Sequence, residues 1–308
     1  MTDKFSIKHF RWEETSDVVA FLNHTSRFEN TEKELSPNLF RQLHEMPGAD
    51  PEKDCFVARD SERKIVAFLH MISEKPINRM VALQTVGECD YREIVATKLC
   101  QVAQEFSRHK FPSTLHVQIS KQDHDWTRAL NNLGWKEVKQ YWNLQRVTEK
   151  NKDLEETIIP KGYKIRSLDI QKDIEEFTEI QNSAFAEHWG FCPNTSDEIF
   201  SRISMERDGQ EGILLIHSEK KIAGYNWTLY SSKNGRSTGW VSMTGVHPDY
   251  RGKKLGKAIV LTGMHALIRR GAKSIELEVD SQNAPARELY FKLGFKKISE
   301  TLWFETII

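Results

Sequence analysis

The chain has 308 residues, of which 39% are hydrophobic and 29% charged, a composition typical of a folded globular protein. This length exceeds the usual size of a single hydrophobic core, so two domains of about 150 residues are expected. The formal net charge is zero, which excludes a chain that binds polyanions over its whole surface; any affinity for phosphate must be local.

No apolar run approaches the roughly 18 residues of a spanning helix, and the first residues show no apolar signal core. The cysteines lie far apart in the sequence, at Cys55, Cys89, Cys100 and Cys192. None forms a C-x-x-C pair or has a histidine at metal-ligand spacing. We therefore expect a cytoplasmic protein with free thiols, no metal and no membrane partner.

The two halves of the chain match each other weakly when one is shifted by roughly 160 residues. The matched segments keep their order: Phe5–Lys8 with Tyr163–Arg166, Arg63–Ala67 with Lys220–Gly224, Asp90–Arg92 with Asp249–Arg251, Leu115–Ile119 with Ile275–Val279, and Asn132–Trp135 with Lys292–Phe295. This order indicates a duplicated domain. We predict domains at 1–148 and 160–308, joined by a charged, non-periodic linker at 149–159.

A strand, a basic glycine-containing loop and a helix follow one another in the second half. Alternation over Trp240–Val246 predicts the strand, and apolar spacing over Leu255–Arg269 predicts the helix. The glycines and basic residues of this region are Gly252, Gly256, Arg251, Lys253, Lys254 and Lys257. Unpaired amides and the positive dipole of a helix N-terminus attract anions, and glycine permits close approach. The loop therefore predicts a site for a phosphorylated cofactor.

A second strand and helix follow. Strict alternation over Ser274–Asp280 predicts the strand. The segment Asn283–Phe295 predicts a short helix, with Pro285 in its first turn and Gly294 as its C-terminal stop.

The two motifs together resemble the GNAT superfamily of acyl-CoA-dependent N-acyltransferases. The loop is similar to its R/Q-x-x-G-x-G/A signature over Arg251–Gly256, with Lys254 where glycine is usual. The later segment is similar to N-x-x-A-x-x-L-Y-x-x-x-G-F, matched at Asn283, Ala286, Leu289, Tyr290, Gly294 and Phe295. The resemblance covers residues 160–308, and the segment Asn182–Phe191 looks like that of tandem proteins of the mycothiol synthase type. It implies α/β (α+β) tandem domains, each a mixed, mostly antiparallel sheet flanked by helices, with neighbouring parallel strands that splay around the cofactor.

The resemblance also implies roles for individual residues. It places the cofactor at Gly245, Val246, Arg251, Gly252, Lys253, Lys254, Leu255, Gly256, Lys257 and Asn283, with an oxyanion donor among the backbone amides near Gly245–Val246. Tyr290 matches the general acid, although an aromatic packed in the core is the alternative. Asn283 is alternatively a helix N-cap.

The general base and the acceptor wall are less sharply defined. Glu278 stands 12 residues before Tyr290, as a proposed base does in ribosomal-protein alanine acetyltransferases. A water chain is an equally good base, since an acidic strand face is commonly only solvated. The acceptor wall would include Glu187, His188 and Trp189, for which an aromatic-rich core loop is the alternative.

The first copy lacks these features. Its loop position reads Glu93-Ile-Val-Ala-Thr97 without glycine, and Leu130 stands at the position of Tyr290. Asp123 stands where the second copy has Asn283. A carboxylate beside a phosphate is repulsive, and leucine has no proton to donate. We therefore expect a degenerate first domain and one cofactor site per chain.

The expected function is transfer of an acetyl group from acetyl-CoA, by direct attack, to an amine of a small molecule. A protein or peptide N-terminus is the alternative acceptor. A non-catalytic CoA-responsive binding protein is the alternative outside catalysis, because of Lys254 and the open question of the base. The sequence has no face of basic residues interleaved with aromatic ones, so nothing in it indicates nucleic-acid binding. The chain is expected to be a monomer or a homodimer.

Overall fold

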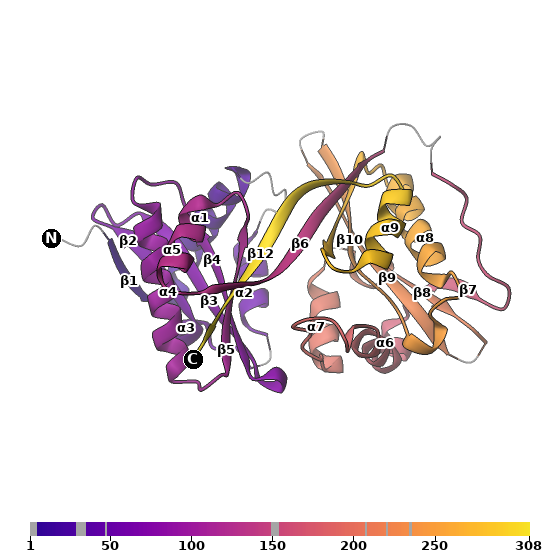
Figure 1. The fold of residues 1–308 in the computed structure, drawn as a ribbon, viewed down its shortest axis with the longest axis horizontal. Helices are drawn as coiled ribbons and strands as arrows, with labels where there is room; N and C mark the ends of the chain where they lie inside the picture. Colours follow the sequence, from indigo (N-terminus) through magenta and orange to yellow (C-terminus); the bar gives the residue numbers. More distant parts are fainter. Residues whose placement is uncertain are drawn as a thin grey trace. The chain divides into compact units, whose positions relative to one another are not determined.

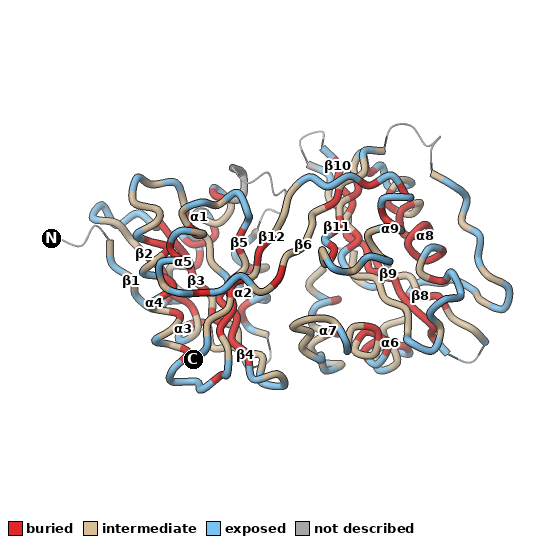
Figure 2. The backbone as a smooth tube through the Cα atoms, viewed as in Figure 1, coloured by how far each residue is buried: buried red, intermediate tan, exposed pale blue. Residues whose placement is uncertain are grey.

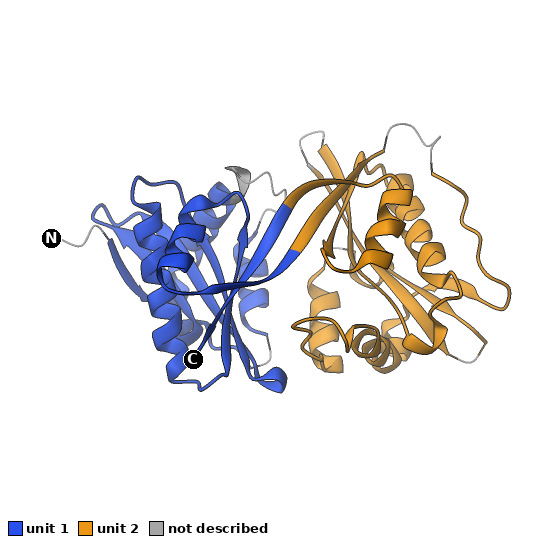
Figure 3. Cartoon of the chain, in the orientation of Figure 1, with its two compact units in different colours: residues 1–140, 300–308 blue, residues 141–299 orange. Residues whose placement is uncertain are grey.

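The computed structural model describes residues 5–28, 35–46, 48–148, 154–206, 208–219, 221–233 and 236–308. It divides the chain into two compact units (Figure 3). The first comprises Met1–Gln140 with Glu300–Ile308, and the second comprises Tyr141–Ser299. None of the described helices combines the length and apolarity that a bilayer crossing requires.

The first unit is a mixed sheet with helices on both faces (Figure 1). Its elements from this half are β1 (Phe5–His9), α1 (Thr15–Phe28), α2 (Pro37–His44), α3 (Pro51–Asp54), β2 (Cys55–Asp60), β3 (Ile65–Glu74), β4 (Arg79–Val86), α4 (Arg92–Arg108), β5 (Thr114–Ser120) and α5 (His124–Asn132). Neighbouring strands are antiparallel except for the parallel pair β4–β5. Helices α4 and α5 cover one apolar face, and α1 and α2 cover the other.

The second unit repeats this order of elements. They are β7 (Lys164–Ser167), α6 (Ile170–Phe185), α7 (Ser196–Met205), β8 (Ile213–His217), β9 (Ile222–Lys233), β10 (Arg236–Val246), α8 (Leu255–Arg269), β11 (Ser274–Asp280) and α9 (Ala284–Lys292). The pair β10–β11 is parallel, and its other pairs are antiparallel. Helices α8 and α9 pack on one face, and α6 and α7 on the other. Buried residues concentrate along these strands and on the inner faces of the helices (Figure 2).

The last strand of each half contributes to the sheet of the other unit. Strand β6 (Lys136–Val147) begins in the first unit, and its residues 141–147 pair with β11. Strand β12 (Lys296–Ile307) begins in the second unit, and its residues 301–307 pair with β5. The colour changes within β6 and β12 in Figure 3 mark this exchange.

The exchange shifts the domain boundaries from those that the sequence predicted. The expected domains were 1–148 and 160–308, but residues 141–148 lie in the second unit and residues 300–308 in the first. Of the predicted linker, residues 149–153 lie outside the described residues, and 154–159 form no helix or strand. The predicted fold class, a mixed and mostly antiparallel α/β sheet flanked by helices, is confirmed.

Candidate active site in the second unit

The parallel strands β10 and β11 pair over only part of their lengths. Their ladder joins Thr238–Trp240 to Ser274–Glu276, although β10 continues to Val246 and β11 to Asp280. Just beyond the ladder, a β-bulge interrupts the pairing of β10 with β9 between Val241 and Met243. A bulge bends its strand and increases the local twist, which accounts for the parting of β10 from β11. Beyond this ladder, the C-terminal ends of β10 and β11 therefore do not pair with each other.

The backbone of β10 directs the amide of Val246 toward the edge that faces β11. The amide of His247 donates to the carbonyl of Ala223 at 2.9 Å, so it points toward β9. Backbone groups alternate between the two edges of a strand, so the amide of Val246 points the other way. Gly245 has a packing reason: a Cβ there would lie 2.7 Å from Ala184 Cβ and 2.9 Å from Tyr225 Cε1.

The loop after β10 ends in two left-handed residues before α8 begins. Gly252 has φ +77°, and Lys254, the N-cap of α8, has φ +63°. A side chain in this conformation costs roughly 1–2 kcal/mol, which explains why glycine is usual at the position of Lys254. None of the described side chains caps the helix and its first turn carries no acidic residue, so the first amides of α8 are left for water or a ligand.

Gly256, in the first turn of α8, has no packing reason to be glycine. Among the described residues, a Cβ there would meet only Val246 Cγ2, at an ordinary contact distance of 3.8 Å. By contrast, a Cβ on Gly263 of the same helix would lie 2.6 Å from Asn226 Oδ1. Glycine within a helix costs roughly 0.5–1 kcal/mol relative to alanine. The protein's own packing thus explains Gly263 but not Gly256.

The basic side chains of the loop have partners of their own. Lys257 Nζ lies 2.7 Å from Glu155 Oε2, and Lys253 Nζ lies 4.8 Å from the ring centroid of Tyr250. Arg251 Nη2 donates to the carbonyl of Ala184 at 3.0 Å. These half-exposed groups keep positive charge near the start of α8 while their side chains are anchored.

Arg251 also links the loop to the predicted acceptor wall. Its Nη1 lies 3.5 Å from Glu187 Oε2, just beyond the end of α6. His188 packs against Phe185, with ring centroids 4.6 Å apart, and Trp189 is half-buried beside it. Reciprocal hydrogen bonds between Asn182 and the backbone of Asn194, at 2.9 and 3.0 Å, close the loop that carries these residues. The acceptor wall and the basic loop are therefore neighbours.

Helix α9 holds Tyr290 and Asn283 in different settings. The Tyr290 side chain is 6% exposed and packs edge-on against Phe295, with centroids 5.7 Å apart. Burial raises the pKa of Tyr290 to about 12, so its phenol is protonated at neutral pH. Asn283 is the N-cap of α9, and its Oδ1 accepts from the amide of Ala286 at 3.2 Å.

The exchanged strand β6 lies alongside the acidic face of β11. Glu278 is exposed, and its cross-strand partner is Asn143. Glu276 accepts from Gln145 Nε2 at 2.8 Å, and Tyr141 stands opposite Asp280. Partners directly opposite share a face, so first-half residues border the predicted base. This pairing was not predictable from the sequence, because alternation in β6 does not reveal its partner strand.

The equivalent region of the first unit is closed by its own side chains. Helix α4 begins directly at Arg92, whereas α8 begins four residues after Arg251. Arg92 Nη1 lies 2.8 Å from Asp123 Oδ1, and Glu93 Oε2 lies 2.7 Å from Arg128 Nε. Between β4 and β5, Gln84 Nε2 donates to the carbonyl of Gln118 at 2.8 Å. The amide of Gln84 thus bridges the two strands beyond their ladder.

Comparison with known proteins agrees with this geometry. Residues 174–295 match the model of the Acetyltransferase (GNAT) family. The mycothiol acetyltransferase of Pseudarthrobacter chlorophenolicus is 29% identical over 167 residues, which are 53% of this chain and 51% of that protein. The chain therefore spans about half the length of this relative.

Two solved structures share the fold along nearly the whole chain. A GCN5-related N-acetyltransferase from Sphaerobacter thermophilus has a TM-score of 0.75 and 18% identity, covering 100% of this chain and 96% of that one. A tandem GNAT protein from the clavulanic acid biosynthesis pathway has a TM-score of 0.74 and 14% identity, with 98% of each chain covered. The chain therefore has a tandem GNAT fold, and its residues 174–295 are those that match the Acetyltransferase (GNAT) family.

Proposed function

We propose that the chain transfers an acetyl group from acetyl-CoA to an amine of a small molecule, at a single site in the second unit. The observation that carries this proposal is the start of α8. Its amides are uncapped, its first turn has no acid, and Gly256 leaves space that the fold does not fill. An anionic pyrophosphate fits such a helix terminus by both charge and hydrogen bonding.

Bound acetyl-CoA would supply a thioester whose carbonyl carbon the amine attacks, with the CoA thiolate as the leaving group. The amide of Val246, directed toward the edge facing β11, would donate to the carbonyl oxygen as negative charge develops there. Gly245 allows α6 to pack closely at this point, which fixes the strand end.

The proton movements of the reaction would fall to two side chains. Tyr290 would donate its phenolic proton to the departing sulfur, because its raised pKa keeps it protonated. The attacking amine must lose a proton, and Glu278, directly or through a water chain, would accept it. Asn283 has its Oδ1 engaged as an N-cap, and its Nδ2 would be the group that contacts the cofactor.

Basic residues around the loop would hold the phosphates. Lys253, Lys254 and Lys257 would contribute charge, with Leu255 and Gly256 contributing amides. Arg251, anchored on Ala184, would set the distance between the cofactor and the acceptor wall of Glu187, His188 and Trp189. A relative named mycothiol acetyltransferase favours a small-molecule acceptor over a peptide.

The test is release of free CoA thiol when the full chain is mixed with acetyl-CoA and a panel of small amines and peptides with free N-termini. We expect release that depends on a small amine and exceeds the hydrolysis seen without acceptor. Release with peptides alone would show that the acceptor is a peptide N-terminus and not a small-molecule amine. A rise in melting temperature with CoA, but no release with any amine, would indicate a binding protein. Absence of both effects at millimolar CoA would contradict the proposal.

A further inference from the structure

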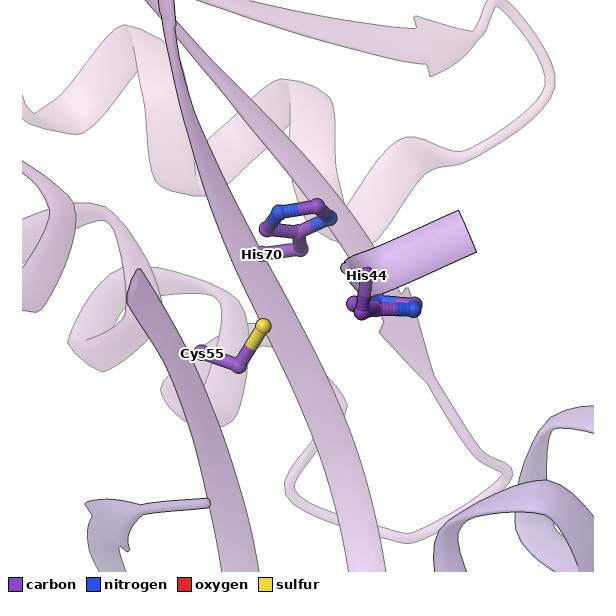
Figure 4. A group of neighbouring side chains, drawn as sticks. All are labelled: His44, Cys55 and His70. Carbon is purple, nitrogen blue, oxygen red and sulfur yellow. The ribbon is translucent and has the colours of Figure 1, made fainter. Parts of the chain in front are cut away.

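Three potential metal ligands converge in the first unit, far from the site described above in sequence. Cys55 opens β2, and its direct cross-strand partner in β3 is His70. His44 is the last residue of α2, which covers the same face of the sheet. The ligand atoms of the three side chains all lie within 4.8 Å of one another. Figure 4 shows the thiol and the two imidazoles gathered in one place from a helix and two strands.

The surroundings of these residues are apolar and ordered. The Cys55 side chain is fully buried and His44 is 8% exposed, whereas His70 is only half-buried and gives the group a side toward solvent. The His44 ring stacks on Phe40 at a centroid distance of 3.9 Å and meets Phe68 edge-on at 5.9 Å. The aromatic packing therefore fixes the plane of this imidazole.

A backbone hydrogen bond gives His44 the tautomer that a metal requires. Its Nδ1 lies 2.8 Å from the carbonyl oxygen of Phe40, and a carbonyl can only accept, so Nδ1 carries the proton. Nε2 is then left with a lone pair. Donation from the second ring nitrogen to a carbonyl is the usual way in which a protein orients a histidine ligand.

We propose that His44, Cys55 and His70 bind a divalent first-row transition metal, with Zn²⁺ as the physiological ion and water as its fourth ligand. Two imidazoles and a thiolate are typical zinc ligands, and three protein ligands leave one position of a tetrahedron open. Bond lengths of about 2.0–2.3 Å place the ligand atoms of such a tetrahedron roughly 3.3–3.6 Å apart. Side-chain rotations that move the ligand atoms by about 1 Å would bring them from their observed separations to this geometry. The sheet would not have to move.

Binding would replace the thiol proton of Cys55 by the metal and release that proton to solvent. The ion would then join the end of α2 to two neighbouring strands in the unit whose cofactor position is closed. This inference is independent of the proposed acetyl transfer, because none of its residues lies in the second unit.

The test uses untagged full-length protein, freed of metal with a chelator and titrated with Zn²⁺ by calorimetry and with Co²⁺ by absorption spectroscopy. We expect one equivalent of either ion per chain, a thiolate-to-cobalt charge-transfer band, and a higher melting temperature with Zn²⁺. Cys55→Ala should abolish the band. His70→Gln, at a partly exposed position, should weaken Zn²⁺ binding at least tenfold and serves if Cys55→Ala does not fold.

Cys100→Ala is the matched control, because Cys100 is another buried thiol of the same unit that lies in the other apolar cluster. It should keep the band and the stoichiometry. Failure of the parent protein to bind either ion at micromolar concentration would overturn the proposal. So would a charge-transfer band that persists in Cys55→Ala or disappears in Cys100→Ala.

Discussion

Tyr290 combines a reactive group with a core position. Its ring belongs to the apolar cluster beneath α8 and α9, and its phenol has a pKa of about 12. A purely structural role would need the ring but not the hydroxyl. An acid role needs the hydroxyl, so removing the oxygen alone separates the two.

We predict that Tyr290→Phe folds like the parent and lowers kcat by roughly 10²–10⁴-fold, as loss of a general acid does. Tyr230→Phe is the control, because Tyr230 stands opposite Gly239, at the end of β10 that is still paired with β11. Steady-state rates with an accepted amine and thermal melting of both variants provide the measurement. If Tyr290→Phe keeps turnover within about threefold of the parent, Tyr290 only packs.

At the scale of elements, the two halves differ most in how a helix begins. Helix α4 starts at an arginine already paired with Asp123 and has Glu93 in its first turn, whereas α8 follows a loop with two left-handed residues and has no acid in its first turn. A charge-assisted hydrogen bond contributes roughly 1.5–3 kcal/mol. Loss of two or three such bonds costs roughly 3–9 kcal/mol, and a loss above about 4 kcal/mol takes a micromolar site beyond the millimolar range.

Calorimetry should therefore give about one CoA per chain. Gly256→Glu should abolish binding, because its carboxylate would repel the phosphates. The same carboxylate favours a helix N-terminus, so loss of binding would not reflect a weaker helix. Thr97→Glu, the matched change in α4, should leave affinity unchanged. Two CoA molecules per chain, or normal binding by Gly256→Glu, would mean that the first unit holds a working site.

Local patterns predicted the elements around the site well. The bounds of α8 and β11 match those predicted from apolar spacing and strict alternation, and Gly294, the predicted stop, has a left-handed φ of +83°. Pairing between distant segments was not predictable. The meeting of Cys55 with His70 depends on the register of β2 and β3, and no sequence spacing encodes the approach of His44.

The strand exchange was missed for the same reason. Leu144 in β6 and Phe304 in β12 are both buried residues of alternating strands that follow a helix and a glycine turn. Each would suit the sheet of its own half. Yet Leu144 lies in the core of the second unit and Phe304 in the core of the first. Two copies of one domain have similar sheet edges, so alternation specifies the face of a strand but not its partner.

At the scale of the whole molecule, each unit therefore depends on a strand from the other half of the sequence. Phe304 is 2% exposed, whereas Ile307 of the same strand is 72% exposed. We predict that Phe304→Ala lowers the free energy of unfolding by roughly 3–5 kcal/mol, and that Ile307→Ala changes it by less than about 0.5 kcal/mol.

Hydrogen exchange followed by mass spectrometry would locate the effect. Phe304→Ala should reduce protection in β4 and β5, although the substituted residue lies in the second half of the sequence. Ile307→Ala should reproduce the parent pattern. Loss of protection confined to β10 and β11 would show that β12 belongs to the sheet of its own half.

The exchange also sets the order of events during synthesis on the ribosome. Strand β5 ends at Ser120, but its partner residues in β12 begin at Thr301. The pairing of β5 with β12 therefore cannot form until about 180 further residues have been synthesised. At a translation rate of roughly 5–20 residues per second, this wait lasts on the order of 10–40 seconds. Throughout it, β5 presents an open edge, which is a template for pairing with other chains. The nascent first half is thus the species for which a chaperone would matter most.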